Sequence, residues 1–183
     1  MTRVLGISGS LRAGSFNTAL LRAAQALAVP GLELEIATLH GIPLYDGDLE
    51  QREGLPLAVR ELKARVMASD ALLLATPEYN NGIPGVFKNA IDWLSRPASE
   101  IPQVFGGRPV ALVGASPGGF GTILAQDAWL GVLRTLGTRF WSGGRLLVSR
   151  AGQAFDAEGG LADERTRAQL AGFLAGYRDF IAG

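Results

Sequence analysis

Strand-like and helix-like segments alternate along the whole sequence. The run at residues 71–75 (ALLLA) is continuously apolar, as expected for a strand that is buried on both of its faces. Elsewhere apolar residues recur at helical spacing, as they do at Phe16, Ala19, Leu20 and Ala23. Strands are predicted over residues 4–8, 32–39, 71–75, 109–115 and 146–148, and helices over 16–27, 55–66, 84–94, 122–136 and 163–181. This alternation predicts an α/β fold in which a parallel sheet carries helices on both faces.

The number of strands restricts the topology further. Because crossovers between parallel strands are right-handed, few arrangements remain, and the doubly wound order 2-1-3-4-5 suits five strands. The chain has 183 residues and no linker-like stretch, so residues 1–183 are predicted to form one domain. Ligands of such sheets bind beyond the carboxyl ends of the strands. The loops after the first, third and fourth strands are therefore expected to carry the function.

Composition excludes several kinds of chemistry. The chain has no cysteine and a single histidine, His40, which excludes disulfides, thiolate nucleophiles, cysteine-held metal centres and multi-histidine metal sites. Lysine plus arginine equals aspartate plus glutamate at 17 each, so neither a nucleic-acid partner nor an acidic docking surface is indicated. No signal peptide or apolar run of membrane-spanning length is apparent, which predicts a cytoplasmic protein without a membrane partner. If the chain is an enzyme, a cofactor is expected to do the chemistry.

The loop after the first strand, residues 8–17 (SGSLRAGSFN), has the groups that bind phosphate. It offers serine hydroxyls, the Arg12 guanidinium and the Asn17 amide, and the following helix adds free N–H groups. It matches neither the dinucleotide-binding fingerprint nor a triphosphate-binding loop, because Ser15 stands where the latter needs lysine. A terminal monophosphate is the better candidate. The alternative is an ordinary glycine turn in which Ser15 caps the helix.

The loops after the third and fourth strands are also suited to a ligand. In residues 76–85 (TPEYNNGIPG), Tyr79 is able to stack on a planar heterocycle and Asn80 to bond it. Glu78 is a candidate general base, but a role as acceptor for nearby backbone N–H groups is favoured. In residues 115–122 (ASPGGFGT), glycine N–H groups are candidates to face a ligand carbonyl or a developing negative charge, unless this is only a flexible surface turn.

Together the three loops resemble those of the NADPH-dependent FMN reductase family of flavodoxin-like proteins. The resemblance rests on Gly9-Ser10-Leu11-Arg12 with Ser15 and Asn17, on Pro77-Glu78-Tyr79-Asn80 followed by Gly82, Pro84 and Gly85, and on Lys88-Asn89-Ala90-Ile91-Asp92-Trp93. It spans nearly the whole chain, although it is looser after Gly121 and the segment 140–144 (FWSGG) matches no family pattern. The resemblance implies a single-domain, flavodoxin-like three-layer sandwich with FMN at the carboxyl edge of the sheet.

The resemblance also implies roles for residues of the three loops. The phosphate site would comprise Ser10, Arg12, Ser15 and Asn17, and Phe16 is counted with these cofactor-binding residues. Pro77, Glu78, Tyr79 and Asn80 would line the flavin ring or its ribityl chain, and Ser116, Pro117, Gly118 and Gly119 would meet the pyrimidine end of the ring. No metal and no catalytic side chain is implied.

The activity implied by the resemblance is a two-electron transfer from NADPH or NADH to a small acceptor such as a quinone or free flavin. The flavin would carry the redox chemistry in a ping-pong mechanism. The identity of the acceptor, the preferred nicotinamide, and whether FMN stays bound or acts as a substrate are left open. A one-electron flavodoxin-type carrier is an alternative, although the zero net charge argues against it. A redox-silent flavin-binding module is another, whereas a signalling receiver domain would need acidic residues near Ser8 and Ser10.

The resemblance further implies a homodimer or homotetramer. The helix at 84–94 would lie at the subunit interface with Trp93 buried there, although core packing of Trp93 is nearly as plausible. On this helix Lys88 and Asp92, and Asp92 and Arg96, are spaced to form ion pairs. Residues 45–48 are expected to form an ordinary loop rather than to reach a neighbouring subunit's site.

Overall fold

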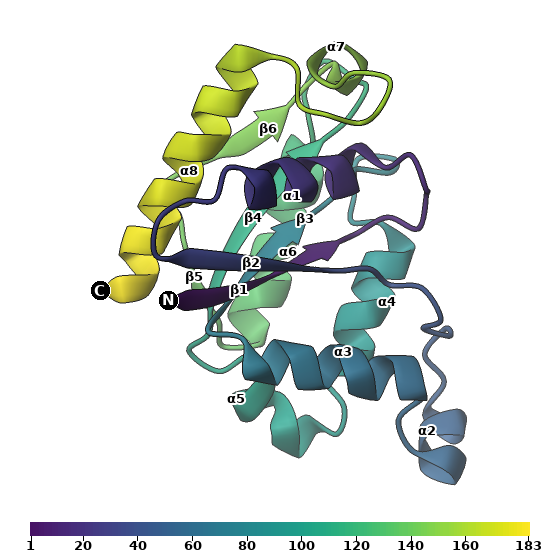
Figure 1. Cartoon of the computed structure of the whole chain (residues 1–183). Coiled ribbons are helices and arrows are strands. Elements are labelled where there is room, and N and C mark those ends of the chain that lie inside the picture. Colours follow the sequence, from purple (N-terminus) through teal and green to yellow (C-terminus); the bar gives the residue numbers. More distant parts are fainter.

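A parallel sheet runs through the centre of the molecule (Figure 1). The computed structural model describes residues 1–183, and its strands are β1 (Thr2–Ser8), β2 (Leu32–Ala37), β3 (Ala71–Ala75), β4 (Pro109–Ala115), β5 (Arg139–Phe140) and β6 (Leu146–Val148). The sheet has the order β2-β1-β3-β4-β5, β6 also pairs with β4, and every pairing is parallel. The doubly wound order expected from the sequence is therefore confirmed.

The fifth position of the sheet is shared by two short strands. The prediction of one strand at 146–148 is incomplete, because β5 pairs with the start of β4 and β6 with its end. Trp141 begins the interruption and packs its indole edge-on against Phe173 at 4.7 Å between ring centroids. A Cβ added at Gly143 would lie 2.5 Å from the indole Nε1, and one at Gly144 2.8 Å from Cη2. The glycines of the unassigned FWSGG segment thus make room for this tryptophan.

The longer helices divide between the two faces of the sheet. They are α1 (Phe16–Ala26), α3 (Leu57–Ala68), α4 (Gly85–Leu94), α6 (Ile123–Thr135) and α8 (Glu164–Ala182), which agrees with the five predicted helices. One hydrophobic core joins α1 and α8 to one face of the sheet, and a second joins α3, α4 and α6 to the other. The core residues of β3 alternate between the two, Leu73 entering the first and Leu72 the second, as the two-residue period of a strand requires. No helix has the length and apolar character needed to cross a membrane.

Four short helical segments were not predicted: α2 (Gly47–Glu53), a 3₁₀ turn (Ala98–Glu100), α5 (Ile101–Val104) and α7 (Ala151–Ala154). The expectation of an ordinary loop at 45–48 therefore holds for Tyr45 and Asp46 but is wrong for Gly47 and Asp48, which begin α2. Asp46 caps α2 by accepting a hydrogen bond from the Asp48 N–H at 2.9 Å. No residue of α2 is buried, so the helix has no apolar periodicity from which it could be predicted.

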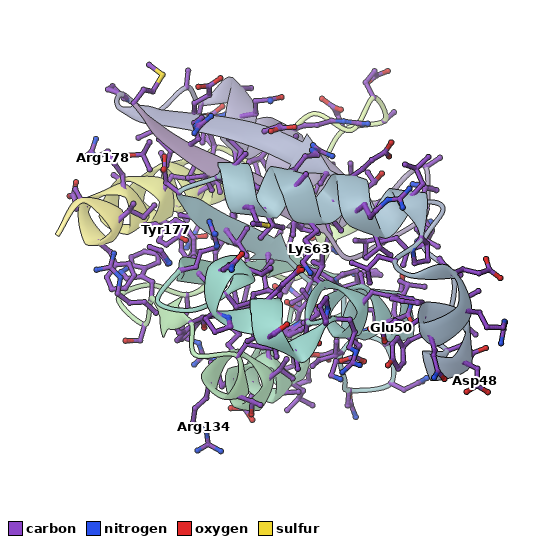
Figure 2. All side chains as sticks on the ribbon, turned by 90° about the horizontal axis from the view of Figure 1, so that it is seen from below. Asp48, Glu50, Lys63, Arg134, Tyr177 and Arg178 are labelled. Carbon is purple, nitrogen blue, oxygen red and sulfur yellow. The ribbon has the colours of Figure 1, made fainter.

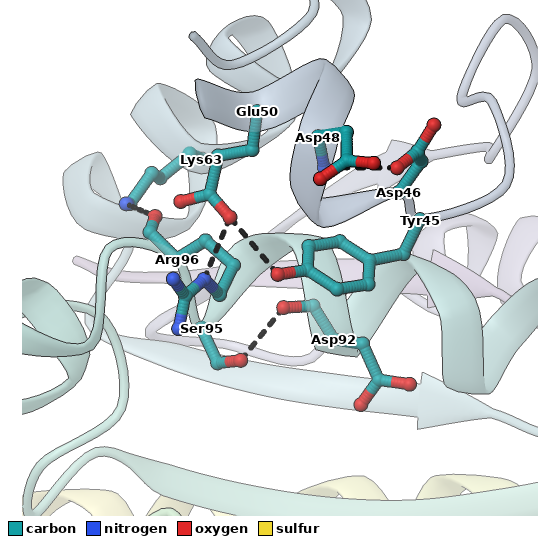
Figure 3. Close-up of polar contacts among 8 residues, drawn as sticks. All are labelled: Tyr45, Asp46, Asp48, Glu50, Lys63, Asp92, Ser95 and Arg96. Carbon is teal, nitrogen blue, oxygen red and sulfur yellow. Dashed lines mark hydrogen bonds and ion pairs between the residues drawn. The ribbon is translucent and has the colours of Figure 1, made fainter. Parts of the chain in front are cut away.

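Polar contacts hold α2 against the end of α4 (Figure 3). The Arg96 Nε–H donates to Glu50 Oε2 at 2.8 Å, and the Tyr45 hydroxyl donates to the same oxygen at 3.0 Å. The bond from Arg96 lowers the pKa of the Glu50 carboxyl below its ordinary value. The expected Asp92–Arg96 pair is therefore wrong, because Arg96 is engaged by Glu50, whereas Lys88 and Asp92 do pair at 2.7 Å.

Trp93 is fully buried within its own chain. Its Nε1–H donates to the Pro43 carbonyl at 2.9 Å, and its ring meets Tyr45 edge-on at 4.9 Å between centroids. The expectation that Trp93 becomes buried at a subunit interface is corrected accordingly. Trp93 instead packs in the core of its own chain, which was the other interpretation. Its hydrogen bond to Pro43 anchors the segment that precedes α2.

Candidate functional site

Three loops meet at the carboxyl edge of the sheet. They are the first loop (residues 8–17, after β1), the second loop (76–85, after β3) and the third loop (115–122, after β4). Backbone bonds continue just beyond the strands: Gly9 N–H donates to the Ala75 carbonyl, and Thr76 N–H to the Val113 carbonyl, both at 2.9 Å. Because neighbouring parallel strands end at one edge, the fold brings together the three loops singled out from the sequence.

The first loop combines a capped helix with unused backbone donors. The Ser15 side chain caps α1 by accepting a hydrogen bond from the Thr18 N–H at 3.3 Å, which confirms the capping role. The N–H groups of residues 13–17 make no hydrogen bond within the chain. Ser10 is buried beside them, and Arg12 is exposed. Free N–H groups at the positive end of a helix dipole form an anion site, so capping by Ser15 and phosphate binding are compatible.

Asn17 connects the first loop to the third. Its Nδ2–H donates to the Ala115 carbonyl at 2.9 Å, and its Oδ1 accepts from the Ala115 N–H at 3.0 Å. The side chain is buried, so both bonds are shielded from water. Asn17 thus sets the position of α1 against the end of β4, and its direct contact with a phosphate stays a prediction. The neighbouring Phe16 is half-buried and stacks on Phe155 at 5.7 Å between centroids.

The second loop contains a tight two-residue turn. Tyr79 and Gly82 exchange backbone hydrogen bonds at 3.2 and 3.1 Å. Between them Asn80 and Asn81 have φ angles of +51° and +62°, a conformation that asparagine tolerates better than most residues. The turn leaves Tyr79 47% exposed at the edge of the sheet. Tyr79 and Asn80 are therefore available to a ligand, as expected from the sequence, while their contact with one stays a prediction.

Glu78 joins the second loop to the helix that follows the third. Its Oε2 accepts hydrogen bonds from the N–H groups of Leu124 and Ala125 at 2.8 and 3.0 Å. These are among the first N–H groups of α6, which lack partners within the helix. Thr122, the residue at the N-cap position, makes no side-chain hydrogen bond that caps the helix. The favoured interpretation of Glu78 as a backbone acceptor is confirmed, and its carboxylate is engaged rather than poised to act as a base.

The glycines of the site fall into two groups, and the first group is required by packing. A Cβ added at Gly114 would lie 1.8 Å from Thr122 Oγ1 and 2.6 Å from the Thr76 carbonyl oxygen. A Cβ at Gly9 would lie 2.2 Å from Phe87 Cδ1. Glycine at these two positions lets neighbouring segments approach closely. Packing alone therefore explains why glycine is present there, and no ligand is needed.

The second group of glycines faces open space. A Cβ at Gly14 or Gly119 would meet no atom within 4 Å, and one at Gly118 would meet only Ser116 Oγ at 3.7 Å. None of the three has a positive φ. Neither packing nor backbone conformation within the chain therefore requires glycine there. The N–H groups of Gly118 and Gly119 also make no hydrogen bond in the chain, so the third loop offers bare backbone donors at the edge of the sheet.

The two groups of glycines lead to a matched prediction. We expect Gly114→Ala to lower the free energy of unfolding by about 1–3 kcal/mol through over-packing. Gly118→Ala should change it by less than about 0.5 kcal/mol, because the added methyl group points into open space. Urea unfolding followed by tryptophan fluorescence measures both values. Equal destabilisation by the two substitutions would contradict this division of the glycines.

The sequence is similar to those of known flavin and quinone reductases. Residues 2–153 match the family model described as NADPH-dependent FMN reductase. An NAD(P)H-dependent FMN reductase from Pseudomonas aeruginosa is 47% identical over 165 residues, covering 90% of this chain and 87% of the relative. A 2-hydroxy-1,4-benzoquinone reductase from a Burkholderia species is 35% identical over 179 residues, covering 98% and 96% of the two chains.

A solved structure extends the similarity to the whole fold. The flavoenzyme NAD(P)H:(acceptor) oxidoreductase FerB from Paracoccus denitrificans superposes with a TM-score of 0.88 at 37% sequence identity, covering 100% of this chain and 98% of that one. The family model matches well over half of the chain and includes all three loops. The chain belongs to the NADPH-dependent FMN reductase family.

Proposed function

We propose that residues 1–183 form one FMN-binding domain that transfers two electrons from NAD(P)H to a small acceptor. The observation that carries this proposal is the row of unbonded N–H groups at the start of α1, beside Ser10, Arg12 and Ser15. These groups suit the terminal phosphate of FMN, and the membership of the family supports the same cofactor. The quinone and flavin reductases among the relatives support a quinone or free flavin as acceptor.

The remaining residues of the edge fit the rest of FMN. Tyr79 and Asn80 would hold the flavin ring or ribityl chain, and Ser116 and Pro117 would flank its pyrimidine end. The unbonded N–H groups of Gly118 and Gly119 would donate to that end of the ring, where reduction adds negative charge. When bound, FMN supplies the redox chemistry by accepting a hydride from NAD(P)H and passing two electrons on. We propose a ping-pong order, in which donor and acceptor use the same exposed face in turn.

The proposal is tested by an anaerobic absorbance titration. Purified protein loaded with FMN is bleached with NADPH or NADH and then reoxidised with a benzoquinone. We expect bleaching by a nicotinamide and recovery of the flavin bands on addition of acceptor. Failure to bind FMN would overturn the proposal. Bound flavin that resists both nicotinamides would instead identify a redox-silent module, and reoxidation in one-electron steps only would identify a carrier.

Assembly and location complete the proposal. We propose a homodimer or homotetramer, supported by large apolar side chains that the single chain leaves exposed near the site, such as Phe120 and Leu124. Light scattering coupled to size-exclusion chromatography measures the subunit number, and a monomer at micromolar concentration would contradict it. A cytoplasmic location stays a prediction from the sequence.

Arg12 provides a test of the phosphate site. Loss of a hydrogen bond to a charged group corresponds to a decrease of roughly 10- to 150-fold in affinity, so we expect Arg12→Ala to weaken FMN binding by that factor. Flavin fluorescence titration gives the dissociation constant. Arg22→Ala is the matched control, because Arg22 is an exposed arginine on α1 that forms no ion pair. An unchanged FMN affinity in Arg12→Ala would remove Arg12 from the site.

A further inference from the structure

A polar hollow of about 430 Å³ opens at the carboxyl end of β6. The segment after β6, which lines this hollow, is hydrogen-bonded to the third loop. Arg150 N–H donates to the Gly118 carbonyl at 2.9 Å, and Ala151 N–H donates to the Ser116 carbonyl at 3.0 Å. The volume lies within the range of about 300–1,000 Å³ that is typical of small-molecule sites. The residues that line it include Leu147 and Val148 of β6, Gln153 of α7, and Arg165 and Gln169 of α8.

The hollow carries an excess of positive charge. Arg150 and Arg165 line it, and neither takes part in an ion pair. The one acidic group in the lining, Asp163, is occupied as the cap of α8, where Oδ2 accepts from the Thr166 N–H at 2.8 Å and from its hydroxyl at 2.5 Å. These two bonds hold the pKa of Asp163 below its ordinary value. Asp163 therefore stays ionised, and the lining has two guanidinium groups against one carboxylate.

A second hollow of about 470 Å³ continues the first along α8. The two share Leu147 and Gln169, and the second adds the exposed guanidinium of Arg145. Its lining includes Gly143 and Gly144, which lie in the interruption between β5 and β6. The combined groove therefore begins beside the third loop and leads away from the three loops with three arginines along it.

This combination of groups suits a phosphorylated nucleoside. Guanidinium groups bind phosphate oxygens through paired hydrogen bonds. The side-chain amides of Gln153 and Gln169 are able to donate to and accept from ribose hydroxyls. If the three loops bind FMN, the nicotinamide of the donor has to lie there, and the rest of the dinucleotide has to extend from it. Resting on the proposed function, we propose that the hollow binds the adenosine half of the donor, with Arg150 and Arg165 recognising the 2′-phosphate of NADPH. The chain then discriminates NADPH from NADH.

The test compares two nucleotides that differ by this phosphate. Adenosine 2′,5′-bisphosphate and AMP are titrated by calorimetry into the FMN-loaded protein and into its Arg165→Gln and Arg150→Gln variants. We expect each substitution to weaken bisphosphate binding about ten-fold, as for one charge-assisted contact, and to leave AMP binding within about two-fold. Arg134→Gln is the matched control, since Arg134 is an exposed arginine on α6 that projects away from the molecule (Figure 2).

Three results would overturn the proposal. The first is equal binding of adenosine 2′,5′-bisphosphate and AMP by the unmodified protein. The second is an equal loss of bisphosphate affinity in Arg134→Gln. The third is displacement of the bisphosphate by inorganic phosphate at equal concentration, which would identify a simple anion site. The nucleotides carry no nicotinamide, so these outcomes are independent of flavin reduction, and failure of the proposed function shows separately as loss of FMN binding. Thermal unfolding confirms that each variant is folded.

Discussion

Replacement of Asn17 by alanine is expected to lower the free energy of unfolding by about 2–6 kcal/mol, because two buried backbone groups of Ala115 each lose a partner. We also expect FMN binding to weaken at least about ten-fold, since the first and third loops would no longer be held in register with each other. Urea unfolding of the protein without flavin gives the first value. Flavin fluorescence titration under native conditions gives the second.

Asn89 provides a matched control for Asn17. Its amide makes the same pair of contacts, donating to the Pro43 carbonyl at 2.9 Å and accepting from the Tyr45 N–H at 2.8 Å. Asn89 is only half-buried, so water is able to replace the lost bonds, and we expect Asn89→Ala to cost about 1–2 kcal/mol. Its FMN affinity should remain unchanged. Equal effects of the two substitutions on FMN affinity would show that the Asn17 bridge has no particular role in the site.

The Trp93→Ala variant is expected to lose about 3–5 kcal/mol of stability, as is typical for truncation of a fully buried tryptophan. The substitution removes the core contact of α4, the hydrogen bond to Pro43 and the edge-on contact with Tyr45. Trp93→Phe keeps an aromatic ring but loses the N–H donor, so a smaller loss is expected. Guanidinium unfolding monitored by circular dichroism measures both variants.

Protein concentration distinguishes the two roles considered for Trp93. A side chain in the core of one chain contributes to stability independently of concentration, whereas an interface residue contributes through association. We expect the difference in the free energy of unfolding between the unmodified protein and Trp93→Ala to be the same at low and high protein concentration. Concentrations of about 1 and about 50 µM span the range in which a micromolar dimer dissociates. A loss confined to the higher concentration would assign Trp93 to a subunit interface.

Local signals predicted most of the fold and the location of the site. Because buried faces leave a pattern of apolar residues, the sequence identified the five long helices and five of the six strands. Parallel topology then placed the three loops at one edge of the sheet. The features that this pattern missed lack such a signal. The α2 helix buries no residue, and β5 has only two residues next to Trp141.

The sequence by itself determined the alternation of strands and helices, the parallel order of the sheet, and a first loop whose groups are suited to a phosphate. Only the tertiary structure decided what those loops are attached to. Asn17 bonds Ala115, 98 residues away, Glu78 caps a helix 46 residues away, and Trp93 bonds Pro43, 50 residues away. The physical reason is that periodicity and loop composition are local properties of the chain. The partner of a buried polar group is instead chosen by which segments packing brings within hydrogen-bond distance.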